Sequence, residues 1–248
     1  PVPSRRLGRS LGIDPVPAKT CNWNCVYCQL GRTSRYTSER RHFGNSTMIL
    51  AQVKETLRRH HEDEIDWITF VGSGEPTLNA ELGRIITGVK ELTTIPVAVI
   101  TNGSLLSFPE VRKELGAADA VLPTLDAGTQ ELFLRINRPH PTFSFLRHSA
   151  GLRSFRDSYD GELWIEVMLL DGINDTADAL EDLALVVEQT YPDQVHLTLP
   201  ERPPSEAFVH PATMDGRNRA RGILGEVATV VPTTGGVVDL SEGVTPAE

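Results

Sequence analysis

Cysteine is scarce in this sequence: the 248 residues contain three, and all three lie between positions 21 and 28. Secreted domains that depend on disulfides carry an even and larger number of cysteines, spread along the chain. Three thiols packed into eight residues do not form such a framework. The scarcity therefore excludes a disulfide scaffold and favours metal ligation in a reducing compartment.

Long apolar stretches are also missing. No run in the sequence approaches the roughly 18 apolar residues that a membrane-spanning helix needs. The N-terminus lacks the apolar segment and small-residue cleavage site of a secretory signal. We therefore predict a cytoplasmic protein that does not associate with a membrane.

Basic residues are not in excess either. The sequence has 24 Lys and Arg and 33 Asp and Glu, which gives a net charge of −9. Such acidic bulk opposes general binding to nucleic acid. Residues 1–41 differ, with eight basic residues against two acidic ones, a local charge of +6. This basic segment, residues 5–41, predicts contact with phosphates of a substrate or of RNA, or else a solvated loop; its basic residues are Arg5, Arg6, Arg9, Lys19, Arg32, Arg35, Arg40 and Arg41.

The pattern of apolar residues along the sequence indicates an α/β fold. Short β-branched runs alternate with longer amphipathic ones, the pattern of repeated βα units around a mainly parallel sheet. Six units are too few for a complete eight-stranded barrel, so we predict a partial (β/α)6 barrel. We expect one domain over 1–248, with a core of about 4–200 and a C-terminal cover over 201–248. Strands are expected at 10–13, 67–71, 97–101, 120–125, 163–170 and 194–199, and helices at 48–61, 79–92, 108–115, 143–159 and 176–190.

Helix starts and the C-terminal part can be predicted in more detail. Ser46 or Thr47, Asn79, and Asn174 or Asp175 are suited to cap helix N-termini. The segment 201–213 is rich in proline and polar residues, which predicts irregular structure. A short helix near 217–224 and a strand near 227–231 are expected to follow.

The three cysteines are spaced C-x3-C-x2-C, as Cys21, Cys25 and Cys28. This spacing is compact enough for one loop to wrap a cubane iron–sulfur cluster, and three ligands leave one iron open. A zinc site usually has four Cys or His ligands, and the nearest histidine, His42, lies beyond an Arg-rich loop. The spacing therefore favours a [4Fe-4S] cluster.

The same motif, with the aromatic Tyr27 just before the last cysteine, resembles the signature of the radical SAM superfamily. The resemblance implies that the open iron chelates S-adenosylmethionine (SAM) and that the backbone around Tyr27 approaches its adenine. It also implies reductive cleavage of SAM to methionine and a 5′-deoxyadenosyl radical, which abstracts hydrogen from a substrate or adds to it. A core aromatic is the alternative for Tyr27.

Further motifs follow the predicted strands. The stretch after Val71, Gly72-Ser73-Gly74-Glu75, lacks the third glycine of a dinucleotide motif and the lysine of a phosphate loop. It resembles the glycine-rich stretch that binds the SAM ammonium in this superfamily. By the same resemblance the next strand ends hold the ribose and carboxylate of SAM, and a later apolar stretch packs on adenine; the residues concerned are Asn102, Thr124, Asp126 and Leu170. Helix capping is the alternative for Asn102 and Asp126.

Substrate-contacting residues are expected on the last strands. His196 and Thr198 alternate with apolar neighbours, and so does Glu166, which predicts that all three face the barrel interior. Glu201 and Arg202 follow the last predicted strand. We take these five as candidate catalytic residues, with a satisfied core residue as the alternative for His196.

The segment 4–33 is similar to short proteins grouped with the wyosine (tRNA imidazoguanosine) synthetases. Those enzymes use a second cluster, and no cysteine remains here to ligate one, so we do not expect their reaction. The substrate is expected to be a phosphorylated metabolite or an RNA nucleoside. A glycyl-radical-enzyme activating protein and a non-enzymatic iron sensor are the alternatives. As a radical SAM oxidoreductase the protein is expected to need an electron donor such as flavodoxin or ferredoxin.

Overall fold

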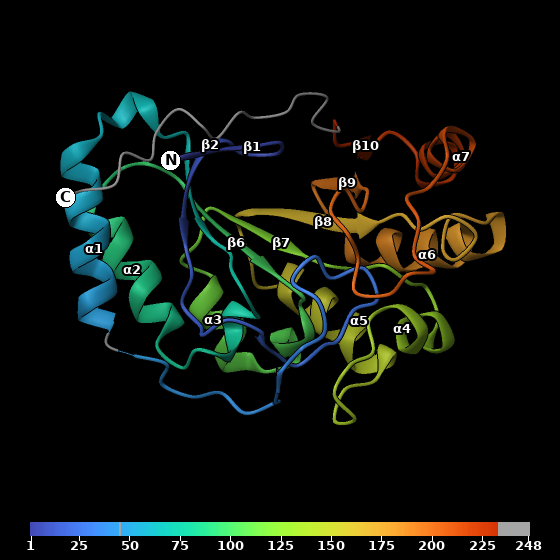
Figure 1. Ribbon diagram of the computed structural model, residues 1–248, viewed down its shortest axis with the longest axis horizontal. Coiled ribbons are helices and arrows are strands. Elements are labelled where there is room, and N and C mark those ends of the chain that lie inside the picture. The colour runs from blue at the N-terminus through green and yellow to red at the C-terminus, as the bar shows by residue number, and fades with distance from the viewer. Residues whose placement is uncertain (45, 233–248) are drawn as a thin grey trace.

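Within the part of the chain that the structure describes, the main sheet has eight strands, of which the seven from β2 onward are parallel. A computed structural model describes residues 1–44 and 46–232. The strand order is β1-β2-β5-β6-β7-β8-β9-β10, and β1 pairs with β2 antiparallel. The sheet curls into a half-barrel (Figure 1). The strands are β1 Val2–Ser4, β2 Gly8–Ile13, β5 Trp67–Phe70, β6 Val97–Thr101, β7 Ala120–Pro123, β8 Glu162–Met168, β9 Gln194–Thr198 and β10 Ala228–Val230.

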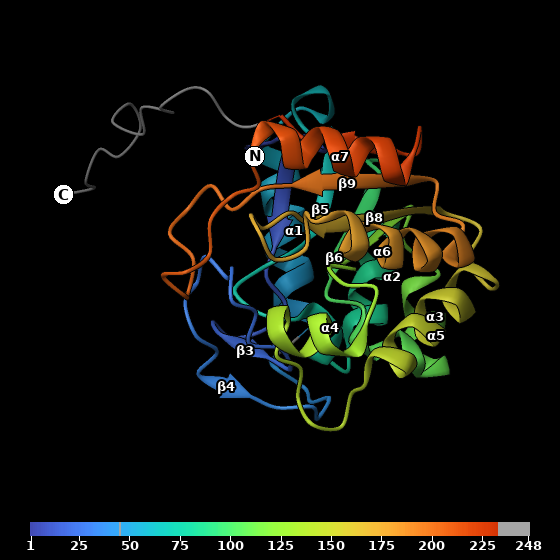
Figure 2. The same cartoon turned by 90° about the vertical axis from the view of Figure 1, so that its right-hand side faces the viewer.

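A second, two-stranded sheet of β3 Thr20–Cys21 and β4 Arg35–Tyr36 carries the start of the cysteine motif. In Figure 2 this pair lies apart from the main sheet, on the side away from helices α3 and α5. Among the described residues, no helix is long and apolar enough to cross a membrane. The helices are α1 Ser46–Arg59, α2 Leu82–Leu92, α3 Pro109–Leu115, α4 Gln130–Ile136, α5 Phe145–Arg156, α6 Ala177–Thr190 and α7 Met214–Leu224, with 3-10 turns at Glu62–Glu64, Pro76–Leu78 and Ser104–Ser107.

The two faces of the sheet carry different side chains. Alternate apolar residues such as Phe70, Val99 and Ile165 face the helices and form the main core with them. On the opposite, concave face Ala98 and Ala120 form a second, smaller apolar cluster with Leu7, Leu122 and Trp164. The concave face is therefore the interior of the half-barrel, and Leu7 packs there against both small and large side chains.

All six predicted strands are present, and the predicted strand near 227–231 is β10. The segment 201–213 forms no helix or strand, as expected, and the part of the predicted cover beyond Pro232 lies outside the described residues. The helix α4 was not predicted. Its seven residues are too short to show a clear apolar period, although Thr129 caps it by accepting a hydrogen bond from the Leu132 amide at 3.3 Å.

Two predicted helix caps are wrong. Thr176 caps α6, because the side chain of Asn174 is already occupied in the preceding loop, where its Oδ1 accepts from the Leu170 amide at 2.8 Å. The helix α2 begins at Leu82 after Glu81, which makes no side-chain cap bond. Asn79 instead forms a turn, its Oδ1 accepting from the Glu81 amide at 2.9 Å. Ser46 is the first residue of α1, and its hydroxyl donates to Glu81.

Candidate functional site

The cysteine loop runs from β3 and lies against the carboxyl ends of the parallel strands. The amide nitrogen Nδ2 of Asn102, which directly follows β6, lies 3.7 Å from Cys21 Sγ. The Nδ2 of Asn137, which directly follows α4, lies 3.8 Å from Cys25 Sγ. The amide of Cys28 donates to the Cys25 carbonyl at 3.1 Å. Two donors therefore point at sulfur, the arrangement that stabilises a thiolate or a sulfur bound to metal.

The residues between the cysteines hold the loop in place. Trp23 is buried, and its ring lies 5.2 Å from the Phe133 ring and 5.3 Å from the His148 ring. Asn22 donates to the Ser104 hydroxyl at 2.7 Å and accepts from Asn102 Nδ2 at 2.7 Å. These side chains fix the backbone directly after Cys21.

The thiols fit an iron–sulfur cluster in chemistry. Burial, with a contribution from the Glu75 charge, raises the pKa of Cys21 to about 12, and burial also raises the pKa of Cys25. A buried thiolate needs a nearby cation, and a metal ion supplies one. Among the described residues, no three Cys, His, Asp or Glu converge as ligands of a single ion. In a cubane each thiolate binds a different iron, so the three thiols need not converge on one ion.

The glycine stretch after β5 packs directly on the base of the cysteine loop. The Glu75 amide donates to the Thr20 carbonyl at 2.9 Å. A Cβ on Gly74 would overlap that same carbonyl oxygen, so only glycine allows this approach. Gly72 and Ser73 lie against Asp14, whose carboxylate accepts from the Ser73 amide at 2.9 Å.

Glu75 itself is buried and links β5 to β6. Its carboxylate accepts hydrogen bonds from the Thr77 amide at 3.0 Å, the Thr101 hydroxyl at 2.6 Å and the Asn102 amide at 2.7 Å. Burial raises the pKa of Glu75, and these donors oppose the rise. Glu75 thereby positions Asn102 next to Cys21.

Asp126 connects three segments around the cysteine loop. Its Oδ2 accepts from the Tyr27 hydroxyl at 2.6 Å and from Asn137 Nδ2 at 2.7 Å, and its Oδ1 accepts from the Met168 amide at 2.8 Å. Burial raises the pKa of Asp126 to about 6. The alternative of a helix cap is wrong for Asp126, because Thr129 caps α4. Asn137 was not among the predicted site residues, since it follows the helix that sequence reasoning missed.

Other residues predicted to bind SAM lie near this region. Thr124 forms an isolated bridge with Glu166, and Leu170 is buried in an apolar cluster with Val26, against which Tyr27 packs. The Asn102 side chain also accepts from the Ser104 amide at 2.9 Å. The alternative of a helix cap is nevertheless wrong for Asn102, because Gly103 is the N-cap of the following 3-10 turn and Phe108 that of α3.

Two of the candidate catalytic residues lie together inside the half-barrel. Glu166 and His196 are cross-strand neighbours on β8 and β9, and Glu166 forms an ion pair with Arg6. Thr198 is also buried, but its hydroxyl donates to the Val167 carbonyl at 3.2 Å. Sequence reasoning placed Arg6 only in the basic segment and missed it as a site residue, because the hairpin between β1 and β2 brings it here.

The remaining two candidates lie outside this group. Glu201 pairs with Arg5 at 2.6 Å, and Arg202 is exposed. The structure therefore brings together Glu166, His196 and the unpredicted Arg6, and it leaves Arg202 at the surface.

Most of the basic segment is neutralised by ion pairs. Six of its eight basic residues have an acidic partner within 4 Å in the described part of the chain. Arg40 also donates to the carbonyls of Thr77 at 2.9 Å and Asn79 at 3.1 Å, so it is a structural residue. The partners of Arg5, Arg6, Arg9, Arg32, Arg40 and Arg41 are Glu201, Glu166, Asp66, Glu206, Glu114 and Glu39.

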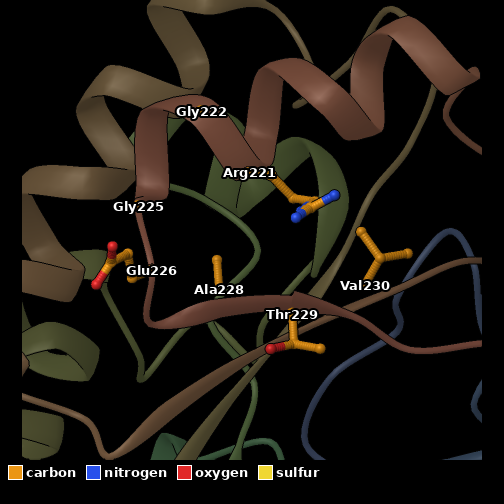
Figure 3. Close-up of a pocket in the computed structure, with 7 residues that line it drawn as sticks. All are labelled: Arg221, Gly222, Gly225, Glu226, Ala228, Thr229 and Val230. Carbon is orange, nitrogen blue, oxygen red and sulfur yellow. The ribbon is translucent and has the colours of Figure 1, made fainter.

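A separate pocket of about 660 Å³ lies between α7 and β10 (Figure 3). Arg221 and Glu226 are its charged side chains, and glycines and short side chains form the rest of its lining. None of the predicted site residues lines it. This pocket is therefore not part of the candidate site.

Comparison with known families and proteins gives a consistent result. The family model described as Radical SAM superfamily matches residues 16–184. A Brachyspira hyodysenteriae protein named GTPase Obg is 44% identical over 202 residues, which are 82% of this chain and 29% of that protein. UPF0026 protein MJ1312 of Methanocaldococcus jannaschii is 37% identical over 227 residues, which are 92% of this chain and 70% of that protein.

Solved structures share the fold. A radical SAM methyltransferase from Sphaerobacter thermophilus has a TM-score of 0.70 at 21% identity, covering 89% of this chain and 65% of that one. A structure of TYW1 with a lysine-pyruvate adduct has a TM-score of 0.57 at 20% identity, covering 77% and 64%. At these identities the likeness is one of fold. The predicted partial barrel is confirmed.

Proposed function

Because this chain belongs to the radical SAM superfamily and to the UPF0026 family within it, we propose that it is an enzyme that cleaves SAM reductively. The resemblance predicted from the cysteine and glycine motifs is confirmed by the family match and by the TYW1 fold. One observation carries the proposal. Cys21, Cys25 and Cys28 lie on a single fixed loop, with the amide groups of Asn102 and Asn137 directed at two of the sulfurs.

The roles we propose for the residues follow from these contacts. Cys21, Cys25 and Cys28 hold a [4Fe-4S] cluster, which supplies the electron that splits SAM into methionine and a 5′-deoxyadenosyl radical. Asn102 and Asn137 hold the thiolates through N–H···S contacts. By the resemblance to the superfamily, backbone carbonyls of the glycine stretch 72–75 would accept hydrogen bonds from the SAM amino group. The inward side chains of β8 and β9 face the substrate. A flavodoxin or ferredoxin reduces the cluster.

The substrate we favour is a small molecule bound within the half-barrel. Supporting this, the polar group of Arg6, Glu166 and His196 lies on the concave face, whereas most of the basic segment is paired with acidic residues. An activase of a glycyl-radical enzyme is the second candidate. Turnover of a small molecule without a partner protein would count against it.

Anaerobic reconstitution tests the proposed SAM cleavage. The chain is loaded with iron and sulfide, reduced with dithionite and incubated with SAM, and 5′-deoxyadenosine is measured. We expect product from the wild type and from the half-buried control Thr56→Ala on α1, and at least a hundredfold less from Cys25→Ala. Equal product from wild type and Cys25→Ala, or a purified chain carrying four-coordinate zinc, would defeat the proposal.

A further inference from the structure

The interior of the half-barrel holds a polar group supplied from outside the barrel strands. Arg6 lies in the turn of the β1–β2 hairpin, and the next residue, Leu7, is buried against Ala98, Ala120 and Trp164 on the concave face. Leu7 anchors the turn inside the half-barrel. Arg6 is thereby held next to Glu166, with which it forms an ion pair.

The charges of this group cancel. Arg6 and Glu166 compensate each other, and their side chains are 20% and 12% exposed. His196 lies beside them and is neutral, because burial and the Arg6 charge together lower its pKa to about 4. A ligand with a net charge would gain no uncompensated opposite charge here, and it would lose its hydration.

Two buried atoms of the group have no hydrogen-bond partner among the described residues, Glu166 Oε1 and His196 Nδ1, and of these Glu166 Oε1 has its ion pair with Arg6. His196 is 7% exposed, and its Nε2 lies 2.9 Å from the Oε1 of Gln194. With the amide oxygen assigned to that position, Nε2 carries the proton and Nδ1 is a bare acceptor. Nδ1 is buried and has no hydrogen-bond partner within the described residues. A buried acceptor of this kind is satisfied when a ligand supplies an N–H or O–H donor.

We propose that Arg6, Glu166 and His196 recognise the substrate of the enzyme proposed above, and that the group they bind is an uncharged planar amide, as found in nucleobases and carboxamides. Such a group presents an N–H donor beside a C=O acceptor. Its donor satisfies His196 Nδ1 or the Glu166 carboxylate, and its acceptor takes one of the remaining guanidinium N–H groups of Arg6. A phosphate brings negative charge that the group does not compensate.

The aromatic neighbours fit a planar ligand and provide a signal for binding. The Trp164 ring lies 5.4 Å from the His196 ring and 5.6 Å from the Trp67 ring. Ligand binding at His196 therefore changes the fluorescence of this tryptophan pair. That the bound molecule is a substrate rests on the proposed function. Its binding, however, is measured without iron or SAM.

The experiment titrates the chain with guanosine, cytidine, nicotinamide and inorganic phosphate, followed by tryptophan fluorescence and calorimetry. We expect at least one of the three uncharged probes to bind, and at least tenfold weaker binding to His196→Phe and to the isosteric Glu166→Gln. The matched exposed pair His60→Phe and Glu64→Gln serves as control and should bind as the wild type does, since His60 and Glu64 face solvent.

The outcomes separate the two proposals. No binding of any uncharged probe, equal binding by the variants, or phosphate binding that depends on these residues overturns this inference even if SAM is cleaved. Probe binding without SAM cleavage sustains it and defeats the proposed function. Should His196→Phe fail to fold, the nitrogen chemical shift of His196 Nδ1 in the wild type decides, because a donor on the probe moves it and an unbound probe does not.

Discussion

At the scale of single residues, Gly74 controls how closely the glycine stretch approaches the cysteine loop. Its α-carbon faces the carbonyl oxygen of Thr20, the residue before Cys21, and a Cβ would overlap that atom. A backbone oxygen cannot turn aside as a side chain can, so added volume must displace Thr20, Cys21 or both.

We therefore expect Gly74→Ala to destabilise the fold by about 1–3 kcal/mol and to lower iron loading at least tenfold. Gly222→Ala on α7 is the matched control, because a Cβ there meets nothing within 4 Å and alanine favours a helix. Urea unfolding and iron analysis measure the two effects. Wild-type iron content in Gly74→Ala would show that the close approach does not matter to the loop.

His148 gives the protein a predicted pH dependence. It is 1% exposed, its Nε2 donates to the Thr124 carbonyl at 3.1 Å, and its ring stacks on Phe133 beside Trp23. Burial lowers its pKa from 6.5 to about 4. Between these values the unfolded chain binds a proton that the folded chain does not.

Stability should therefore fall as the pH drops from 6.5 towards 4, and His148 contributes up to about 3 kcal/mol to this loss. His196, whose pKa is also lowered to about 4, acts with the same sign. Urea unfolding at pH 7 and pH 4.5 measures the change, and His148→Phe should show a smaller loss between the two. An equal loss in both proteins would contradict the assignment to His148.

At the scale of elements, the sequence predicted the strands well and the site only in part. Runs such as Val97–Thr101 are β-branched and buried on both faces, so their composition alone identifies them as interior parallel strands. The cysteine spacing likewise lies within eight residues. Arg6 and Asn137 could not be found in this way, because a hairpin turn and a short helix bring them to the site and no spacing rule connects them to it.

The helix α4 supports the cysteine loop from the side. The carbonyl of Ile136, its last residue, accepts from the Val26 amide at 2.9 Å, and Asn137 follows directly. Thr129 starts this helix, and loss of its cap costs about 1 kcal/mol. Because the helix is so short, its fraying should also disturb the cysteine loop.

Thr129→Ala should lower both the melting temperature and the iron content of the reconstituted chain. Thr176→Ala removes the corresponding cap of α6, which packs on α5 and α7, so it should lower the melting temperature alone. Calorimetry and iron analysis on both variants test this difference. Matching iron contents would show that α4 does not hold the loop.

At the scale of the whole molecule, the half-barrel has an open concave face that the N-terminal hairpin partly fills. Antiparallel β1 and β2 extend the sheet at one edge, and their turn carries Leu7 back onto the concave face. Leu7 from the N-terminal hairpin therefore fills part of the interior of the half-barrel. The polar side chains of Glu166 and His196 lie on this same concave face.

Leu7→Ala should consequently act on both stability and recognition. Leu7 is 2% exposed, and truncating a leucine so deeply buried costs about 2–5 kcal/mol, because the cavity closes only in part. The turn also loses its anchor, so Arg6 should move away from Glu166 and the binding of an uncharged probe should weaken at least fivefold. Val2→Ala, on the same hairpin but 62% exposed, is the control and should change neither property. Urea unfolding measures the stability and tryptophan fluorescence measures the probe binding. A Leu7→Ala protein that is destabilised but binds the probe as the wild type does would contradict the role of Leu7 in placing Arg6.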